Sequence, residues 1–493
     1  MDRRSFIGLV GAGAVLPSGF PGLSKAFQQT PRNPLRRAVT VSGEGLTLTA
    51  RPARVDAGPG LVDAWTLNGS VPSPTIRLLQ GQTARIDLVN QLPERTILHW
   101  HGLAVPQEAD GHPRLAIDPG ETYGYEFPVL DRPGTYWYHP HTHGVTAAQT
   151  YKGIGGLLIV EGDEEDGYEL PSGEYEIPLI LQDKRLGGDL SLAYGVGMPH
   201  DRMHGYLGDT AFANGVADPT VDVRRSRYRL RILNGSNARI FDLGLSNGDP
   251  LTLIGSDGGL LEAPIRAERI MLGPAERADI LVDFSARQSG ERVMLRSLAF
   301  EAPGMMMGMR GGRGGRGMMM GMGGPGQGSE LDLLEFVVQD SPAEPGPPPP
   351  TRFSTVPDHG RITAATPRRT YTFNSSMMMG SGPTHTINGK TFELERVDER
   401  VPVRRTEVWT FVNESELPHP VHVHAGQFRV LSRTGGRARV MAWETGLKDT
   451  VLTMPGERVD VAVRFVHEGL FLLHCHNLEH EDMNMMLNFE VVA

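Results

Sequence analysis

Three stretches of the chain, RIDLVN (85–90), RLRILN (229–234) and VWTFVN (408–413), share one pattern and decide the fold. In each stretch apolar residues alternate with polar ones, and an asparagine ends the stretch. An Asn-Gly pair precedes each one, at 68–69, 214–215 and 388–389. Alternation with a period of two is typical of a half-buried β-strand. The repeat therefore predicts three related β units.

A second repeated feature supports the same division. Each copy continues to a Pro, Gly or Ala, Glu turn, at 119–121, 274–276 and 455–457, and strand-like residues follow the turn. The segment VDVAVRF (459–465) alternates over seven residues. Because Gly and Pro interrupt the chain throughout, long helices are not expected. We predict an all-β protein of three β-sandwiches, at about 40–165, 172–345 and 360–493.

Length and composition agree with this reading and exclude several classes of protein. At roughly 150 residues per domain, 493 residues correspond to about three domains. The net charge of −10 offers no broad basic surface, so we expect no nucleic-acid partner. The single cysteine, Cys475, excludes an intrachain disulfide and a two-cysteine zinc site. The 17 histidines and 21 methionines instead indicate metal binding.

The first 27 residues look like an export signal. Arg3 and Arg4 precede a weakly apolar stretch, and small residues and prolines follow it, as in twin-arginine signals. This route exports folded proteins, which suits a metal loaded before export. No later apolar stretch approaches 18 residues, so we expect no membrane span. The sequence predicts a soluble protein in the periplasm or otherwise outside the cytoplasmic membrane, delivered by the twin-arginine machinery.

Eight histidines form four His-X-His pairs at equivalent places in the first and third units. They are His99 and His101, His139 and His141, His422 and His424, and His474 and His476. Each first pair lies nine and eleven residues after the asparagine that ends its stretch, and each second pair lies five and seven residues after a glycine. The same counts in the second unit reach Leu243, Leu245, Leu295 and Ser297. The second unit therefore keeps the scaffold without these ligands.

The pair spacing predicts a shared metal cluster. Alternate side chains of a strand leave the same face, so each pair projects two imidazoles in one direction. Two pairs from each of two related units can meet across an approximate two-fold interface and enclose several ions. Neutral imidazole favours zinc, copper, iron or nickel over magnesium or calcium.

The C-terminal segment identifies the metal. In the His474-Cys475-His476 tripeptide the cysteine points away from its neighbours, so it should bind a different ion. His419 and His480 add two imidazoles, and Met485 adds a thioether, although Met483 and Met486 lie close enough to be alternatives. Two imidazoles, one thiolate and a weak axial thioether are typical of a blue-copper electron-transfer site. An electron at Cys475 is one covalent step from His474 or His476, and thus has a direct through-bond route into the histidine cluster.

Four motifs carry a resemblance to the multicopper oxidase family: HWHG (99–102), WYHPHTHG (137–144), HPVHVH (419–424) and HCHNLEHEDMNMM (474–486). The resemblance covers the chain beyond the export signal and implies three cupredoxin-like Greek-key domains with four copper ions. It implies that one-electron donors reduce the type 1 ion and that the other three ions reduce dioxygen to two waters. It assigns type 1 copper to His419, Cys475, His480 and Met485, type 2 copper to His99 and His422, and the type 3 pair to His101, His139 and His476 on one ion and His141, His424 and His474 on the other. Asp110 and Glu481 match the positions of proton-supplying carboxylates in similar oxidases.

The substrate is less sharply indicated. Residues 304–323 hold eight methionines without an acid or an aromatic residue, and three more methionines stand at 377–379. Thioether prefers Cu(I), and the segment resembles the methionine-rich segments of bacterial cuprous oxidases. It falls between two strand-like stretches of the second unit, as an insertion. Against this reading, Arg310, Arg313 and Arg316 would repel a cation, and a low-complexity loop without a ligand role is the alternative.

The leading interpretation is an exported, oxygen-reducing copper oxidase that acts on Cu(I), on phenolic or other organic donors, or on both, with a role in copper tolerance. A laccase that acts mainly on phenols, with an incidental methionine segment, is the first alternative. A copper-binding electron carrier would leave the eight paired histidines unexplained. A copper-free structural relative of the same fold would not need copper ligands, yet every ligand position is occupied in this sequence.

Overall fold

Each of the three β units folds as two packed sheets in the computed structural model, which describes residues 33–302, 326–378 and 382–493. The described residues belong to one compact unit that runs from Arg32 to Ala493. The predicted export signal (1–27) and the methionine-rich segment (304–323) lie outside the described residues. The strand-rich architecture confirms the predicted all-β fold.

The first unit has one sheet in the order β4-β3-β6-β8 and one in the order β2-β5-β10-β9-β7. The strands are β2 (Thr40–Ser42), β3 (Glu44–Asp56), β4 (Leu61–Leu67), β5 (Thr75–Leu79), β6 (Thr83–Asn90), β7 (Leu98–His101), β8 (Thr122–Pro128), β9 (Gly134–Pro140) and β10 (Gly156–Glu161). Leu48 and Ile86 from one sheet pack with Ile76 and Leu158 from the other in a common core. The alternating pattern of the sequence thus buries one face of each sheet.

The second unit has sheets in the orders β1-β14-β22-β21-β16-β19 and β13-β12-β11-β15-β20-β17-β18. The strands are β1 (Asn33–Pro34), β11 (Glu176–Lys184), β12 (Thr210–Ala213), β13 (Val216–Ala217), β14 (Pro219–Val223), β15 (Arg227–Asn234), β16 (Phe241–Leu245), β17 (Leu251–Ser256), β18 (Gly259–Ala267), β19 (Ile270–Leu272), β20 (Arg277–Asp283), β21 (Arg292–Ser297) and β22 (Leu331–Val338). β1 precedes the predicted start of the first unit, yet it pairs in parallel with β14 of the second. The backbone N–H of Asn33 donates to the carbonyl of Asp218 over 3.1 Å, which satisfies an edge that would otherwise be unpaired.

The third unit has sheets in the orders β24-β23-β26-β31-β28-β29 and β25-β33-β32-β27-β30. The strands are β23 (Arg368–Met378), β24 (Gly382–Ile387), β25 (Glu399–Pro402), β26 (Glu407–Asn413), β27 (His419–Val423), β28 (Phe428–Thr434), β29 (Leu447–Lys448), β30 (Thr450–Thr453), β31 (Arg458–Val463), β32 (Gly469–Cys475) and β33 (Met486–Val492). Phe411 and Val461 from one sheet pack with Val421 and Phe471 from the other.

The asparagine at the end of each repeated stretch ties down the loop that follows it. The buried side chain of Asn90 donates to two backbone carbonyls and accepts from the backbone N–H of Leu92. Asn234 and Asn413 make the same three kinds of hydrogen bond. Burial of an asparagine requires such partners. The repeat therefore marks a structural device that all three units use.

The Asn-Gly pairs form tight turns in the same way in all three units. Asn68, Asn214 and Asn388 have φ values of 54°, 49° and 53°, and each following glycine is also at positive φ. Two successive residues at positive φ are typical of a type I′ turn, which favours Asn-Gly. The backbone accordingly requires these residue types at these places.

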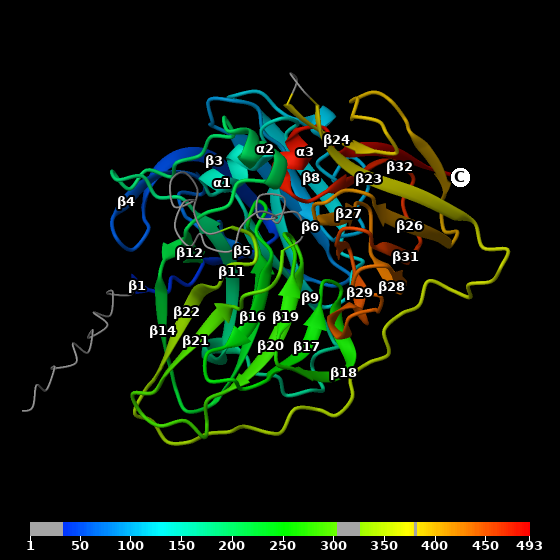
Figure 1. Ribbon diagram of the computed structural model, residues 1–493. Helices are drawn as coiled ribbons and strands as arrows, with labels where there is room; N and C mark the ends of the chain where they lie inside the picture. Colours follow the sequence, from blue (N-terminus) through cyan, green and yellow to red (C-terminus); the bar gives the residue numbers. More distant parts are fainter. Residues whose placement is uncertain (1–32, 303–325, 379–381) are drawn as a thin grey trace, which may run out of the picture. The chain divides into compact units, whose positions relative to one another are not determined.

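Helices are short within the described part of the chain. They are α1 (Thr146–Lys152), α2 (Pro199–His204) and α3 (Leu478–Asp482), with single 3₁₀ turns at Pro113–Leu115, Gly173–Tyr175 and Ala442–Glu444. α2, from the second unit, packs against α3 and β24 of the third (Figure 1). Among the described residues, none of the helices is long and apolar enough to cross a membrane.

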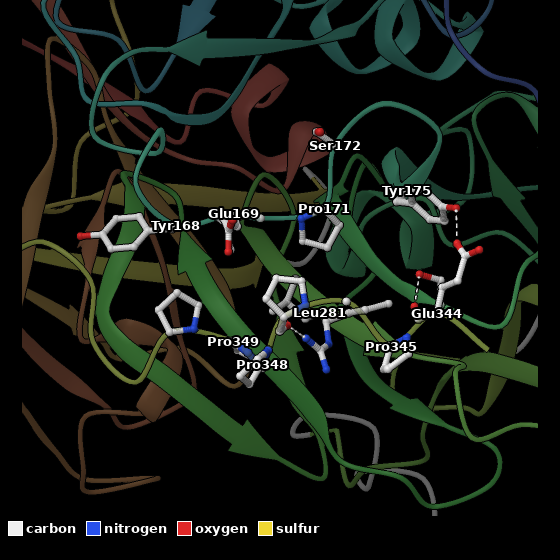
Figure 2. Close-up of a pocket in the computed structure, with 16 residues that line it drawn as sticks. Tyr168, Glu169, Pro171, Ser172, Tyr175, Leu281, Glu344, Pro345, Pro348 and Pro349 are labelled. Carbon is white, nitrogen blue, oxygen red and sulfur yellow. Dashed lines mark hydrogen bonds between the residues drawn. The ribbon is translucent and has the colours of Figure 1, made fainter. Parts of the chain in front are cut away.

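The two connections between units meet on the second unit. Residues 168–175, from the first connection, face residues 344–350, from the second, across a pocket of about 320 Å³ (Figure 2). Ser226 Oγ holds the second connection by donating to the carbonyl of Glu344 over 2.7 Å. The pocket is lined by tyrosines and prolines and by none of the predicted copper ligands.

Candidate metal centre

Strand register brings the histidine pairs together within each unit. β7 and β9 are antiparallel neighbours with His99 opposite His139, and β27 and β32 are antiparallel neighbours with His422 opposite His474. The second member of each pair follows two residues later, so it leaves the same face. Each unit therefore presents four imidazoles as one patch.

The two patches face each other with approximate two-fold symmetry. The ring of His99 stacks on that of His424 at 3.8 Å, and the ring of His101 stacks on that of His422 at 3.7 Å. Since His99 is equivalent to His422 and His101 to His424, the two stacks are related by the exchange of units. The contacts His141 to His474 and His139 to His476, with Nε2 atoms 3.3 and 3.4 Å apart, are related in the same way.

The imidazole nitrogens converge on three places. The groups are His99, His101 and His422; His101, His139 and His476; and His141, His424 and His474. Within each group the ligand atoms lie within 4.8 Å of one another, and all eight side chains are buried. The last two groups are the predicted type 3 sets, and the first contains the predicted type 2 pair.

The donor chemistry fits metal ions rather than a hydrogen-bonded core. Burial lowers the pKa of His99 to about 3 and lowers the pKa values of His101, His139, His141, His422, His424 and His476 well below their usual range. The Nε2 atoms of His424 and His474 approach to 3.1 Å and face the same point, with no polar side chain of the described residues between them to bridge the two rings. A cation fits at that point, because neutral imidazole is the form that binds metal.

The two carboxylates predicted to supply protons both lie against this cluster. Asp110 Oδ2 accepts from His424 Nδ1 over 2.8 Å, and the backbone carbonyl of Asp110 accepts from His99 Nδ1 over 2.7 Å. Glu481 Oε2 lies 3.2 Å from His474 Nδ1. Asp110 Oδ1 has no hydrogen-bond partner within the described structure. The Asp110 carboxylate therefore contacts the cluster at His424, and the Glu481 carboxylate contacts it at His474.

A third carboxylate, Asp449, was not predicted from the sequence. His101 Nε2 donates to Asp449 Oδ1 over 2.9 Å, so His101 presents Nδ1 to His139, whereas the neighbouring ligands present Nε2. The backbone carbonyl of Asp449 accepts from His422 Nδ1 over 2.8 Å. Asp449 precedes Thr450 at the start of β30, where no spacing pattern distinguishes it from other acids.

Asp449 belongs to a buried ionic network that joins the second unit to the cluster. Arg277 of β20 forms an ion pair with Asp449 and lies 3.6 Å from Asp257. Lys448 Nζ lies 2.9 Å from Asp257 and 3.0 Å from Glu276. Burial raises the pKa of Asp449, and Arg277 opposes that effect. The second unit supplies none of the eight histidines of the cluster. Its Arg277 nevertheless positions Asp449, and Asp449 orients the ring of His101.

The predicted blue-copper ligands form a separate buried group. Cys475 Sγ lies 3.4 Å from His419 Nδ1 and 3.7 Å from His480 Nδ1. Burial raises the pKa of the Cys475 thiol, so a metal ion must displace its proton. Met485 shares the core of the third unit with Cys475, whereas Met486 packs in another cluster with Phe392. Met485, and not Met486, therefore packs in the same core cluster as Cys475.

Comparisons with known proteins identify the family of the chain. Multicopper oxidase family models match residues 49–165, 201–301 and 354–493. The chain is 32% identical over 428 residues to a multicopper oxidase of Staphylococcus aureus, covering 86% of this chain and 83% of that one. It is 34% identical over 480 residues to a laccase of Haloferax volcanii, covering 87% and 77%. The crystal structure of McoA from Aquifex aeolicus is similar with a TM-score of 0.81 and 33% identity, over 94% of this chain and all of that one.

The chain belongs to the multicopper oxidase family. Its fold is three cupredoxin-like Greek-key β-sandwich domains, and it is an oxidoreductase that uses oxygen as acceptor. Its cofactors are four copper ions, one of type 1, one of type 2 and a type 3 pair.

Proposed function

We propose that the enzyme couples four one-electron oxidations of Cu(I), of phenolic or other organic donors, or of both, to the reduction of one dioxygen to two waters, and that it serves copper tolerance. The observation that carries the proposal is the convergence of eight buried histidines beside a separate Cys-His group. An electron carrier with a single copper ion would need only the Cys-His group.

We propose the following ligand assignment from the geometry. His419, Cys475, His480 and the axial Met485 hold type 1 copper, and His99 and His422 hold type 2 copper. His101, His139 and His476 hold one type 3 ion, and His141, His424 and His474 hold the other. When bound, the copper ions supply the electron transfer and the oxygen chemistry.

The side chains of the protein connect and protect these ions. Cys475 is bonded to His474 and His476 in the chain, so the type 1 group and the cluster share a short through-bond connection. Asp110 Oδ1, which lacks a partner in the described structure, is placed to hold a proton next to the cluster, and Glu481 is placed likewise at His474. Complete burial of the ligands excludes bulk water from the centre.

The substrate proposal rests on two separate features. The methionine-rich segment (304–323), outside the described residues, carries soft ligands suited to Cu(I). The similarity to a laccase favours organic donors. We therefore keep a laccase with an incidental methionine segment as the second candidate.

Steady-state rates with Cu(I) and with a phenol, measured on the intact protein and on one lacking residues 304–323, distinguish the two candidates. We expect the deletion to reduce Cu(I) oxidation about tenfold or more, with phenol oxidation retained or increased. Unchanged Cu(I) kinetics would reject the role of the segment. Copper analysis provides the control, because both proteins must contain four ions per chain.

We further propose domain limits of about 40–165, 172–345 and 360–493, which the paired sheets support.

We also propose export by the twin-arginine route to the periplasm or another extracytoplasmic compartment, which Arg3 and Arg4 support. Cell fractionation after replacement of both arginines by lysine tests the export route. The protein should then remain in the cytoplasm.

A further inference from the structure

The outer side of the type 1 group is closed by the C-terminal end of α2. His480 Nε2 donates to the carbonyl of Met203 over 3.0 Å. The neighbouring carbonyls of Arg202 and His204 accept from His385 Nε2 over 3.1 Å and from Asn477 Nδ2 over 3.2 Å. Three helix-end carbonyls that lack partners within the helix are thereby satisfied by side chains of the third unit.

Within the described part of the chain, this closure covers the His480 imidazole. The His480 side chain is fully buried, and the cavity beside it, lined by His204 and His480 among others, measures about 20 Å³. Such a cavity accommodates about one water molecule. Electrons must therefore reach His480 through α2 or through the atoms beside it.

α2 carries a pair of histidines at the spacing that binds a metal ion. His200 and His204 lie one helical turn apart, and their ring centroids are 4.6 Å apart. Side chains four residues apart share a helix face, and such His pairs bind metal in other helices. The His200 side chain is 59% exposed, and Asp201 Oδ1 lies 3.7 Å from its Nδ1. Ions in solution can therefore reach the pair through His200.

The helix is held rigidly in place. Arg185 donates to both carboxylate oxygens of Asp201, over 2.7 and 3.0 Å. The backbone N–H of Tyr206 donates to Glu479 Oε2 over 3.0 Å, just before His480 in the chain. An ion bound at the pair would therefore keep a fixed relation to the type 1 group.

We propose that His200 and His204 form the binding site at which Cu(I) gives up its electron. The connection runs from His204 along the backbone to the Met203 carbonyl and across its hydrogen bond to His480. Each bound Cu(I) becomes Cu(II), the electron reduces type 1 Cu(II) to Cu(I), and no proton moves in this step. The inference rests on the proposed Cu(I) oxidase function.

Ion binding provides a test that is independent of turnover. The copper-loaded, fully reduced enzyme is titrated with Cu(I) against a chromophoric Cu(I) chelator, without oxygen. The double variant His200→Gln, His204→Gln should lose one equivalent of bound Cu(I) relative to the wild type. A parallel titration with Ni²⁺ separates this site from the methionines, because imidazole binds nickel and thioether does not compete well. One equivalent of Ni²⁺ should also be lost.

Turnover provides the second measurement. The ratio of the Cu(I) rate to the rate with an organic donor should fall about tenfold or more in the double variant. His467→Gln, which removes a partly buried histidine of the third unit away from α2, is the matched control and should keep the wild-type ratio. The blue absorption of type 1 copper must persist in every variant, which shows that the fold and the resident ions are intact.

The outcomes distinguish failure of the His200–His204 site from failure of the proposed Cu(I) oxidase function. Retention of the extra ion, or of the rate ratio, in the double variant would overturn the His200–His204 site and leave the oxidase function standing. A wild-type enzyme that fails to oxidise Cu(I) would overturn both the site as a substrate site and the Cu(I) part of the proposed function.

Discussion

The partner of each imidazole decides which nitrogen faces the copper cluster. His99, His422 and His424 each donate through Nδ1 to an oxygen of Asp110 or Asp449, which leaves Nε2 for the metal. His101 is reversed, because Asp449 accepts from its Nε2. A hydrogen bond at one ring nitrogen fixes the tautomer and orients the ring. A single carboxylate can thus set the geometry of a metal centre that it does not touch.

At the same scale, the identity of the axial ligand can be tested at Met485. Replacement of Met485 with Leu removes a weak donor to Cu(II) and conserves volume in the core, so the type 1 reduction potential should rise while copper is retained. A redox titration followed by the blue absorption measures the change. An unchanged potential would assign the axial position to Met483 or Met486 instead. Met486→Leu tests the alternative directly and should leave the potential unchanged if Met485 is the axial ligand, because Met486 packs in a different cluster.

Strands and their junctions place the ligands, and one junction also supports the cluster. The register of β7 with β9 and of β27 with β32 aligns two histidine pairs in each unit. Lys448 ends β29 and Asp449 connects it to β30, and both side chains reach into the buried network with Arg277. Arg277 of the second unit thus positions Asp449 at this junction, and Asp449 in turn orients His101.

The network can be tested with Asp449→Asn. The replacement removes one of the two carboxylates beside the buried Arg277 and leaves Asp257 at 3.6 Å, which costs about 1–3 kcal/mol, and His101 loses its charged acceptor. We expect a lower Tm together with a copper affinity reduced about 10–100-fold. Thermal unfolding and copper content per chain measure the two effects. Asp460→Asn, at a partly exposed ion pair in the same unit, should change stability by less than about 1 kcal/mol.

At the scale of the whole molecule, a buried group of ion pairs joins the first unit to the second. Glu165, just after β10, lies between Arg229 and Arg231 of β15, with oxygens 2.8 and 3.1 Å from their guanidinium nitrogens. Burial alone would raise the pKa of Glu165, but Arg231 and Arg229 together lower it to about 2. The contact joins the end of the first unit to the second.

The lowered pKa predicts a pH-dependent contribution to stability. Because the folded-state pKa of Glu165 is below its usual 4.5, its contribution of about 3 kcal/mol is fully present above pH 4.5 and is lost as the pH falls through 2. The Tm difference between the wild type and Glu165→Gln should therefore be large at pH 7 and shrink toward pH 2. Glu126→Gln, at an exposed pair with Arg85, should show a difference below about 1 kcal/mol at both values. A Tm difference for Glu165→Gln that does not depend on pH would contradict the assignment.

The features that depend on local backbone geometry could be predicted from the sequence. Period-two alternation, the Asn-Gly turns and the buried loop asparagines recur because each unit needs them to fold, and the His-X-His spacing follows from the same period. Strand periodicity therefore predicted the β units, and it predicted the eight histidines as a set.

The contacts between groups from distant parts of the chain could not be predicted from the sequence and became known from the folded chain. The reversed ring of His101 depends on Asp449, 348 residues later, and the closure over His480 depends on α2 of the second unit. The addition of β1 to the second unit, rather than to the first, depends on an open strand edge. These contacts arise from the packing of whole units against one another, and no local spacing in the sequence encodes that packing.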